Sequence, residues 1–389
     1  MIRFVYTIIL LALFVACETT KQPASKIRPG AWQMTDYLPL LSGKRVALVV
    51  NQTSRIGNTH LVDTLLARGI EVVALFAPEH GIRGQADAGE KIADSTDPQT
   101  GIPIISLYGR HRQPTPDDLD KIDIVVFDIQ DVGVRFYTYI STLHLVMEAC
   151  ARNGKPLLVL DRPNPNGHYV AGPVLDTAYA SFVGMHPIPV VYGLTIGELA
   201  TMINGEGWLN SPACDLQVIK IANYTHDSSY VLPVKPSPNL PNARAVELYP
   251  SLCFFEPTVV SIGRGTTFPF QVIGYPDSTM GTFSFTPRSM PGMSKYPKHQ
   301  DVTCYGQDLR QGPPTPFTLT YLVDWYQRLA LDTAFFTSNN FFDKLAGSNR
   351  LRHQLQQGLS AEEIAASWQT ELQAYQAKRK KYLLYPDFE

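Results

Sequence analysis

The sequence predicts an α/β fold, in which a parallel sheet with helices on both faces precedes a smaller, helix-rich C-terminal domain. Two observations carry this prediction. Short apolar runs alternate with helical segments as far as about residue 220, and the composition of the 389-residue chain changes after about residue 275. Strands that are apolar throughout are typical of parallel sheets, because helices cover both faces of such sheets.

Local patterns place the individual elements. Apolar, β-rich runs predict strands at residues 45–50, 71–76, 102–108, 123–129, 156–160 and 215–221. Apolar residues at helical spacing predict the intervening helices at residues 60–68, 116–121, 141–153 and 195–204. The last of these helices opens with a capping box, Thr195-x-x-Glu198, which satisfies two backbone N–H groups at a helix start.

The C-terminal third has a different character. Residues 275–316 are rich in Pro, Gly, Ser and Thr, and helical patterns follow at 317–329 and 360–382. The second pattern begins with another capping box, Ser360-x-x-Glu363, and ends in basic residues, which favour a helix C-terminus. We therefore expect a large sheet domain over residues 36–275 and a C-terminal α+β domain over residues 276–389.

The N-terminus is typical of an export signal. Arg3 precedes an unbroken apolar run at residues 4–16, and Cys17 follows in a context that resembles the lipobox of bacterial lipoproteins. We expect residues 1–17 to act as the signal, with Cys17 as the lipidated residue, and residues 18–35 to be a flexible tether. The protein would then be exported and face the periplasm or the cell surface, and only its lipid anchor would contact the membrane.

Composition excludes two broad classes. The chain has 33 Lys+Arg against 35 Asp+Glu and 44% hydrophobic residues, so it is not a disordered polyelectrolyte. It also lacks the excess of positive charge with which nucleic-acid binders displace counterions, so we expect no nucleic-acid partner. Beyond Cys17 no cysteines form a CxxC pair, and we expect free, buried thiols at Cys150, Cys214, Cys253 and Cys304, although export would permit a disulfide.

Charged and polar side chains collect directly after three of the predicted strands. These candidates are Glu79, His80 and Arg83 after the second strand, Asp128, Asp131, Arg135, Tyr137 and Tyr139 at the end of the fourth, and Asp161, Arg162 and Asn164 after the fifth. Because ligands bind at the carboxyl ends of parallel strands, this pattern predicts an active-site cleft there. P-loop, GxGxxG, GxSxG and HExxH motifs are absent, so we expect no nucleotide or other cofactor.

Several roles remain open for these residues. Glu79 could be a general acid with a raised pKa, or could form a salt bridge with Arg83 that only shapes the loop. His80 could shuttle protons or donate to a sugar hydroxyl, or could simply be a hydrogen-bonded loop residue. Glu90, on the same long loop, is a second acid candidate, and the alternative is a solvated carboxylate.

The three aspartates also have two interpretations. Asp128, Asp131 and Asp161 could hold Mg²⁺ or Ca²⁺, since carboxylates on neighbouring strand ends are suitable ligands. We favour the alternative, in which they pair with Arg135 and Arg162 and bind sugar hydroxyls, because each aspartate has an arginine close by in sequence. We therefore expect no metal.

Aromatic and amide side chains could complete the cleft. Tyr137 and Tyr139 could stack on a sugar ring or could merely pack in the interior. Asn239 lies in the rigid segment PSPNLPN, and Arg264 and Thr266 lie in GRGTT, where the planar guanidinium between two glycines could bind an anion.

The longest motifs resemble those of a known family. They are FAPEHGIRGQADAGE (76–90), TGIPIISLYG (100–109), FDIQDVGVRFYTYISTL (127–143), LDRPNPNG (160–167), GPVLD (172–176), LTIGELA (194–200), PSPNLPN (236–242) and GRGTT (263–267). Over roughly residues 38–388 the chain resembles the bacterial exo-β-N-acetylmuramidase family of glycoside hydrolases. The resemblance implies a Rossmann-like domain, a smaller C-terminal domain and a cleft between them.

The resemblance also implies a substrate and a reaction. Members of that family release N-acetylmuramic acid from the non-reducing ends of peptidoglycan fragments, so the expected partners are muropeptides or disaccharides. The glutamate of the family's PEHG motif corresponds to Glu79, which would protonate the leaving oxygen with the help of His80. Asp128, Asp131 and Glu90 compete for the second role, which the acetamido group of the substrate could also fill.

An arginine should recognise the lactyl carboxylate of muramic acid, and the candidates are Arg83, Arg135 and Arg264. Two other functions compete with the glycosidase. One is a metal-dependent hydrolase that uses Asp128, Asp131 and Asp161, and the other is a non-catalytic lipoprotein that binds muropeptides.

Overall fold

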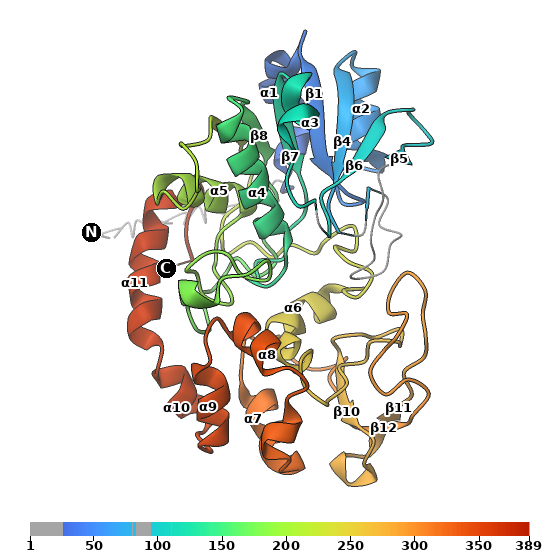
Figure 1. The fold of residues 1–389 in the computed structure, drawn as a ribbon, viewed down its shortest axis with the longest axis vertical. Helices are drawn as coiled ribbons and strands as arrows, with labels where there is room; N and C mark the ends of the chain where they lie inside the picture. The colour runs from blue at the N-terminus through green and yellow to red at the C-terminus, as the bar shows by residue number, and fades with distance from the viewer. Residues whose placement is uncertain (1–25, 80, 83–94, 110, 389) are drawn as a thin grey trace, which may run out of the picture.

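A computed structural model describes residues 26–79, 81–82, 95–109 and 111–388 (Figure 1). Within these residues a seven-stranded sheet has the order β5-β6-β4-β1-β7-β8-β9, and a three-stranded sheet has the order β10-β12-β11. All pairs in the large sheet are parallel except the pair of β5 with β6. The predicted α/β class, with a large and mostly parallel sheet, is confirmed.

The elements have the following bounds. The strands are β1 (Arg45–Val50), β2 (Arg55–Ile56), β3 (Thr59–His60), β4 (Glu71–Ala77), β5 (Ser95–Thr96), β6 (Pro103–Ser106), β7 (Ile124–Asp128), β8 (Leu157–Leu160), β9 (Leu216–Ile219), β10 (Val272–Tyr275), β11 (Phe283–Phe285) and β12 (Cys304–Asp308). The α-helices are α1 (Met34–Leu41), α2 (Leu61–Ala67), α3 (Pro116–Asp120), α4 (Tyr139–Arg152), α5 (Ile196–Gly205), α6 (Ala243–Leu252), α7 (Thr320–Leu329), α8 (Asn339–Ala346), α9 (Arg350–Gln356), α10 (Ala361–Ala366) and α11 (Gln369–Arg379).

Helices cover both faces of the large sheet. In β1, Val46 and Leu48 pack with side chains of α1 and α2, whereas Ala47 and Val49 pack with side chains of α4 and α5. Every residue of β7 and β8 is buried. This double burial explains why these strands are apolar throughout.

The order of the parallel strands creates a defined crevice. The chain builds β1, β4 and β6 outward in one direction, then returns to add β7, β8 and β9 on the other side of β1. This is the doubly wound arrangement of Rossmann-type sheets, in which ligands bind outside the carboxyl ends of the strands, near the point where the direction reverses. Here that point lies between β1 and β7.

The start of the fold differs from the prediction. Arg28 pairs with Ala222 in an antiparallel bridge, and the backbone N–H of Gly30 donates to the Asp161 carbonyl oxygen at 2.7 Å. A Cβ atom at Gly30 would come within 2.3 Å of the Ile219 carbonyl oxygen, so only glycine fits this close approach. The chain from Arg28 onward is therefore part of the fold, and the predicted tether at 18–35 is too long.

The smaller domain contains the three-stranded antiparallel sheet and helices α7 to α11. The sheet and helices α7, α9 and α10 lie in the lower part of Figure 1, and α11 rises along its left side. The strand β10 lies before the predicted boundary at 275/276, but it pairs with β12, so this sheet begins earlier than the composition indicates. The single helix predicted for residues 360–382 is two helices, α10 and α11, separated at Ser367 and Trp368. The capping boxes at Thr195 and Ser360 are confirmed.

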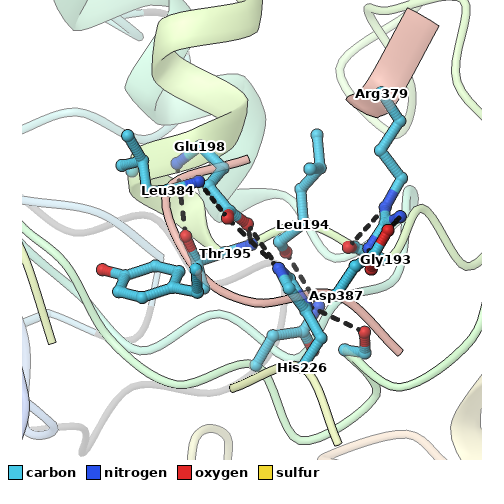
Figure 2. Close-up of polar contacts among 12 residues, drawn as sticks. Gly193, Leu194, Thr195, Glu198, His226, Arg379, Leu384 and Asp387 are labelled. Atoms are coloured by element: carbon cyan, nitrogen blue, oxygen red, sulfur yellow. Dashed lines mark hydrogen bonds and ion pairs between the residues drawn. The ribbon is translucent and has the colours of Figure 1, made fainter. Parts of the chain in front are cut away.

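The chain returns to the large domain at its C-terminus, where α11 runs back beside α5 (Figure 1). Figure 2 shows the polar contacts that hold the last residues in place. Arg379 pairs with Asp387 at 2.7 Å, and the backbone N–H of Leu384 donates to Glu198 at 2.8 Å. Glu198 also pairs with His226 at 3.0 Å, and the side chains of both residues are fully buried.

Two further observations concern the membrane and the thiols. No helix in the described part of the chain is long and apolar enough to cross a bilayer. Cys150, Cys214, Cys253 and Cys304 are all buried and free, as predicted.

The tail contacts predict a stability effect. The Tyr385 hydroxyl donates to Asp161 at 2.6 Å inside the large domain. Tyr385→Phe removes a donor from a buried carboxylate, so we expect the free energy of unfolding to fall by about 1–3 kcal/mol in urea denaturation. Tyr382→Phe is the matched control, because its hydroxyl binds Glu206 near the surface. Equal effects of the two variants would contradict a special role for the buried tail contact.

Candidate active site

Glu79 lies at the carboxyl edge of the sheet, two residues beyond β4. Its side chain is half-buried. The Tyr108 hydroxyl donates to Oε1 at 3.2 Å, and the Thr138 hydroxyl approaches Oε2 at 3.5 Å. These neighbours follow β6 and β7, so three segments that are distant in sequence converge on one carboxyl group.

A small pocket of about 80 Å³ opens beside Glu79. Four predicted site residues line it together with Glu79. They are Tyr137, Tyr139, Asn239 and Arg264. The structure therefore brings these residues together with Glu79, although they are far apart in sequence.

The pocket has an aromatic wall. Tyr137 and Tyr139 meet edge to face at 4.9 Å between ring centroids, and Tyr137 meets Tyr249 in the same way at 5.9 Å. The Tyr137 hydroxyl donates to the Pro236 carbonyl oxygen at 2.7 Å. Burial raises the pKa of Tyr137 well above its usual value, so this hydroxyl stays protonated. Tyr137 and Tyr139 therefore pack against each other and line the pocket, and stacking on a sugar ring stays a prediction.

Arg264 and Asn239 supply complementary polar groups. The Nε atom of Arg264 donates to Glu256 at 2.6 Å, and its guanidinium lies over the Phe270 ring at 5.1 Å. Among the described residues the terminal nitrogens of the fork donate no hydrogen bond, and the side chain is 27% exposed. The Asn239 amide donates to the Met293 carbonyl oxygen at 2.7 Å, and its buried Oδ1 atom has no hydrogen-bond partner in the structure. A cation thus lines the pocket, and an unpaired acceptor lies buried in its wall.

Asp128 lies in the interior rather than in the pocket. Arg162 binds its carboxylate with two hydrogen bonds, at 2.6 and 2.9 Å, and both side chains are buried. A carboxylate in such a bidentate pair is held as a structural anion. The prediction that Arg162 pairs with an aspartate is correct, whereas the geometry provides no access for a substrate to either side chain.

Asp131 is also enclosed. Its Oδ2 atom accepts hydrogen bonds from the Tyr192 hydroxyl and from the backbone N–H of Gly133. Burial raises the pKa of Asp131 to about 6, although the hydrogen bonds from these two donors act to lower it. Neither Asp128 nor Asp131 lines the pocket that contains Glu79. The structure therefore argues against both as the second catalytic group.

The suggestion that Arg135 binds a substrate anion needs correction. Its guanidinium is fully buried and donates to the carbonyl oxygens of Pro173, Ile188 and Leu345 at 2.6–2.8 Å. Burial lowers the pKa of Arg135 to about 9, because the charge has left water. The side chain therefore joins the two domains from inside.

Three more predicted contacts prove to be internal. Asp161 accepts from the Thr195 hydroxyl, the Gly197 N–H and the Tyr385 hydroxyl, at 2.6–2.8 Å. Asn164 donates to the Leu194 carbonyl oxygen, and the Thr266 hydroxyl donates to the Gly263 carbonyl oxygen within the same turn. These side chains are buried, so their predicted substrate contacts are corrected to structural ones.

The remaining predicted residues, His80, Arg83, Glu90 and Cys17, lie outside the described residues. For the metal hypothesis, the described part of the chain contains no group of three or more His, Cys, Asp or Glu side chains that could hold an ion. Asp128, Asp131 and Asp161 are instead occupied by separate internal donors.

The sequence interpretation missed several residues around Glu79. They are Tyr108, Phe136, Thr138, Ser237, Leu240, Tyr249 and Phe270. Most of them lie inside the motifs that carry the family resemblance, which was the signal that could have identified them. Tyr249 and Phe270 lie outside those motifs and come to the pocket only through the packing of α6 against the segment before β10.

A larger cavity of about 710 Å³ adjoins the pocket through Leu240, which lines both. Prolines are frequent in its lining, and its charged side chains are Asp227, Lys235 and Glu247. Glu247 already pairs with Arg244 at 2.7 Å. Glu79, Arg264 and the tyrosines line the smaller pocket and not this cavity.

Breaking a glycosidic bond requires an acid beside the leaving oxygen, and sugars bind against aromatic faces and polar groups. The Rossmann-type sheet and the Glu79 pocket accordingly define the class of this protein, a glycosidase. The chain belongs to the exo-β-N-acetylmuramidase NamZ family. The sequence profile of the family's N-terminal part matches residues 46–244, and the profile of its C-terminal part matches residues 247–385.

Individual relatives agree with this membership. The chain is 40% identical to the peptidoglycan β-N-acetylmuramidase NamZ of Bacillus subtilis, and the match covers 95% of this chain and 93% of that protein. Two crystal structures of DUF1343 family proteins from Bacteroides fragilis are similar. One has 47% identity and a TM-score of 0.87, and the other has 31% identity and a TM-score of 0.82. Each match covers 93% of this chain and 100% of the solved chain.

The burial of Asp131 predicts a pH effect on stability. Because the folded-state pKa of about 6 lies above the unfolded value near 4, the folded state holds this proton more tightly. Asp131 therefore contributes to the free energy of unfolding below about pH 4, and this stabilisation is lost as the pH rises through about 6. Asp131→Asn should remove that loss, so the stability of the variant relative to the native protein should rise between pH 4 and 7, as followed by urea denaturation.

Asp123→Asn is the control for this measurement. Arg45 holds the pKa of Asp123 at about 2, below the unfolded value, so its contribution is lost only as the pH falls below about 4. The difference between this variant and the native protein should stay flat between pH 4 and 7. An equally flat difference for Asp131→Asn would mean that Asp131 is not protonated in the folded state.

Proposed function

We propose that this protein releases N-acetylmuramic acid from the non-reducing ends of peptidoglycan fragments. The observation that carries the proposal is the meeting of Glu79 and Arg264 in one pocket, in a chain of the exo-β-N-acetylmuramidase family. Muramic acid combines a glycosidic bond, which needs an acid, with a lactyl carboxylate, which needs a cation. The pocket offers both groups.

Glu79 protonates the leaving oxygen in this proposal. It is half-buried at the pocket, with a hydroxyl donor near each carboxylate oxygen. Two candidates remain for the second role, because Asp128 and Asp131 are bound in the interior. They are Glu90 and the acetamido oxygen of the substrate itself. Asn239, with a buried acceptor in the pocket, is suited to hold the acetamido N–H.

Arg264 recognises the lactyl carboxylate. Glu256 holds its Nε atom and the Phe270 ring supports its guanidinium, which leaves the terminal nitrogens for a bidentate contact with a carboxylate. The neighbouring acid and ring reduce the freedom of the side chain, so little entropy is lost when the substrate binds.

A disaccharide with N-acetylmuramic acid at its non-reducing end tests the reaction directly. The native protein should release the free sugar, and the isomer with the two sugars reversed should remain intact. Glu79→Gln keeps the shape of the side chain but has no proton to give, so we expect turnover to fall by about 100-fold or more. Unchanged turnover in a folded variant would remove Glu79 from the mechanism, and saturable binding without sugar release by the native protein would indicate a binding protein.

The role of Arg264 makes a separate prediction about specificity. Arg264→Lys keeps the charge but loses the planar fork, and kcat/KM for the muramic acid substrate should fall by about 10- to 100-fold. Hydrolysis of a matched N-acetylglucosaminide, which lacks the lactyl group, should not change.

Arg310→Lys is the matched control for this substitution. Arg310 also pairs with an aspartate, Asp308, and also lies over an aromatic ring, that of Phe268, but it does not line the pocket. Equal losses on both substrates after Arg264→Lys would argue against recognition of the lactyl carboxylate.

We also propose that the protein is exported and anchored by a lipid on Cys17. The support is the apolar run that precedes this cysteine and its lipobox-like context. Labelled palmitate should be incorporated into the native chain and not into Cys17→Ala, and the variant should leave the membrane fraction. Membrane association of Cys17→Ala without label would contradict the anchor and leave the glycosidase proposal untouched.

A further inference from the structure

Tyr108 stands directly beside Glu79 because of the register of two strands. In the parallel pair of β4 with β6, Ala77 is opposite Ser106, and the backbone N–H of Leu107 donates to the Ala77 carbonyl oxygen at 2.7 Å. Glu79 and Tyr108 each follow this pair by two residues. The sheet therefore delivers both side chains to the same edge, although 29 residues separate them in sequence.

The two oxygens of Glu79 have different surroundings. Tyr108 donates to Oε1 at 3.2 Å, while Thr138 is at 3.5 Å from Oε2, which is the limit for a hydrogen bond. Thr138 lines the pocket with Glu79, whereas Tyr108 does not. Tyr108 thus supports the carboxyl group from behind, and Oε2 is the oxygen on the Thr138 side of the pocket.

The Tyr108 hydroxyl keeps its proton at ordinary pH and can donate it to Glu79. Burial first, and then the charge of Glu79 and the hydrogen bond to it, raise the pKa of Tyr108 to about 12. If Oε1 accepts this proton, an acidic proton on Glu79 is left to Oε2. That is the position from which it could be transferred to a leaving group in the pocket.

We propose that Tyr108 is a positioning residue that orients Glu79 and directs its acidic proton to Oε2. This inference rests on the proposed glycosidase function and deepens it. The other titratable and charged side chains near Glu79 in the described part of the chain are Tyr137, Tyr139, Tyr249 and Arg264 in the pocket, with Arg112 beside Tyr108.

Tyr108→Phe removes the hydroxyl and keeps the ring. With muramic acid disaccharide as substrate, kcat should fall by about 10- to 100-fold while KM stays nearly constant, because the pocket contacts remain and the acid is misoriented. A lost donor also destabilises the carboxylate of Glu79, so the alkaline limb of the kcat/KM profile should move to higher pH. A residue that only stabilised the fold would not shift this limb.

Tyr326→Phe is the matched control. The Tyr326 hydroxyl donates to Asp332 at 3.0 Å, and its pKa is also raised to about 12, but it lies in the smaller domain. This variant should leave kcat and the pH profile unchanged. Thermal unfolding of both variants shows whether each one is folded.

The double variant Glu79→Gln/Tyr108→Phe separates this inference from the function on which it rests. If Tyr108 works through Glu79, the double variant should be no slower than Glu79→Gln alone. Full activity of Glu79→Gln would overturn the proposed function. An inactive Glu79→Gln together with a Tyr108→Phe variant of native kcat and native pH profile would overturn only the role of Tyr108.

Discussion

A carboxylate inside a protein must be surrounded by donors, because an unpaired buried charge is very costly. This constraint divides the acids that follow the strands of the large sheet into buried carboxylates with internal donors and one half-buried carboxyl group at the pocket. Asp128 is bound bidentately by Arg162, and Asp161 is surrounded by a threonine hydroxyl, a backbone amide and a tyrosine hydroxyl. Both act as anions of the framework, and they fix the loops that carry the pocket. Glu79 is half-buried at the pocket and is the acid to which we assign the proposed chemistry.

The position of Glu79 follows from topology rather than from local sequence. The β4 strand adjoins β1, and the crevice where the strand order reverses lies on the other side of β1. The loop after β7 crosses this edge and places Thr138, Tyr137 and Tyr139 next to the end of β4. The segment before β10 then closes the pocket with Arg264 and Phe270. One acid from a strand end therefore meets a cation from a distant segment of the chain.

Much of the fold could be predicted, because double burial leaves a clear apolar signature in β1, β4, β7 and β8. The candidate site could be predicted only in part. Residues that follow a strand have no fixed period, so nothing local indicates that Arg135 turns inward while Tyr137 faces the pocket. The internal partners of Asp131 and Asp161, Tyr192 and Tyr385, lie 61 and 224 residues away along the chain. Local patterns carry no information over such separations.

The C-terminal tail has a consequence for the independence of the large domain. The backbone N–H of Leu384 donates to Glu198 (Figure 2). The backbone N–H of His226 donates to the Pro386 carbonyl oxygen, and the Tyr385 hydroxyl donates to Asp161. One partner in each contact therefore comes from residues 384–386, which follow the helices of the smaller domain along the chain. The large domain is therefore not an autonomous N-terminal unit, and a variant truncated before residue 384 would leave Glu198 and Asp161 without these donors.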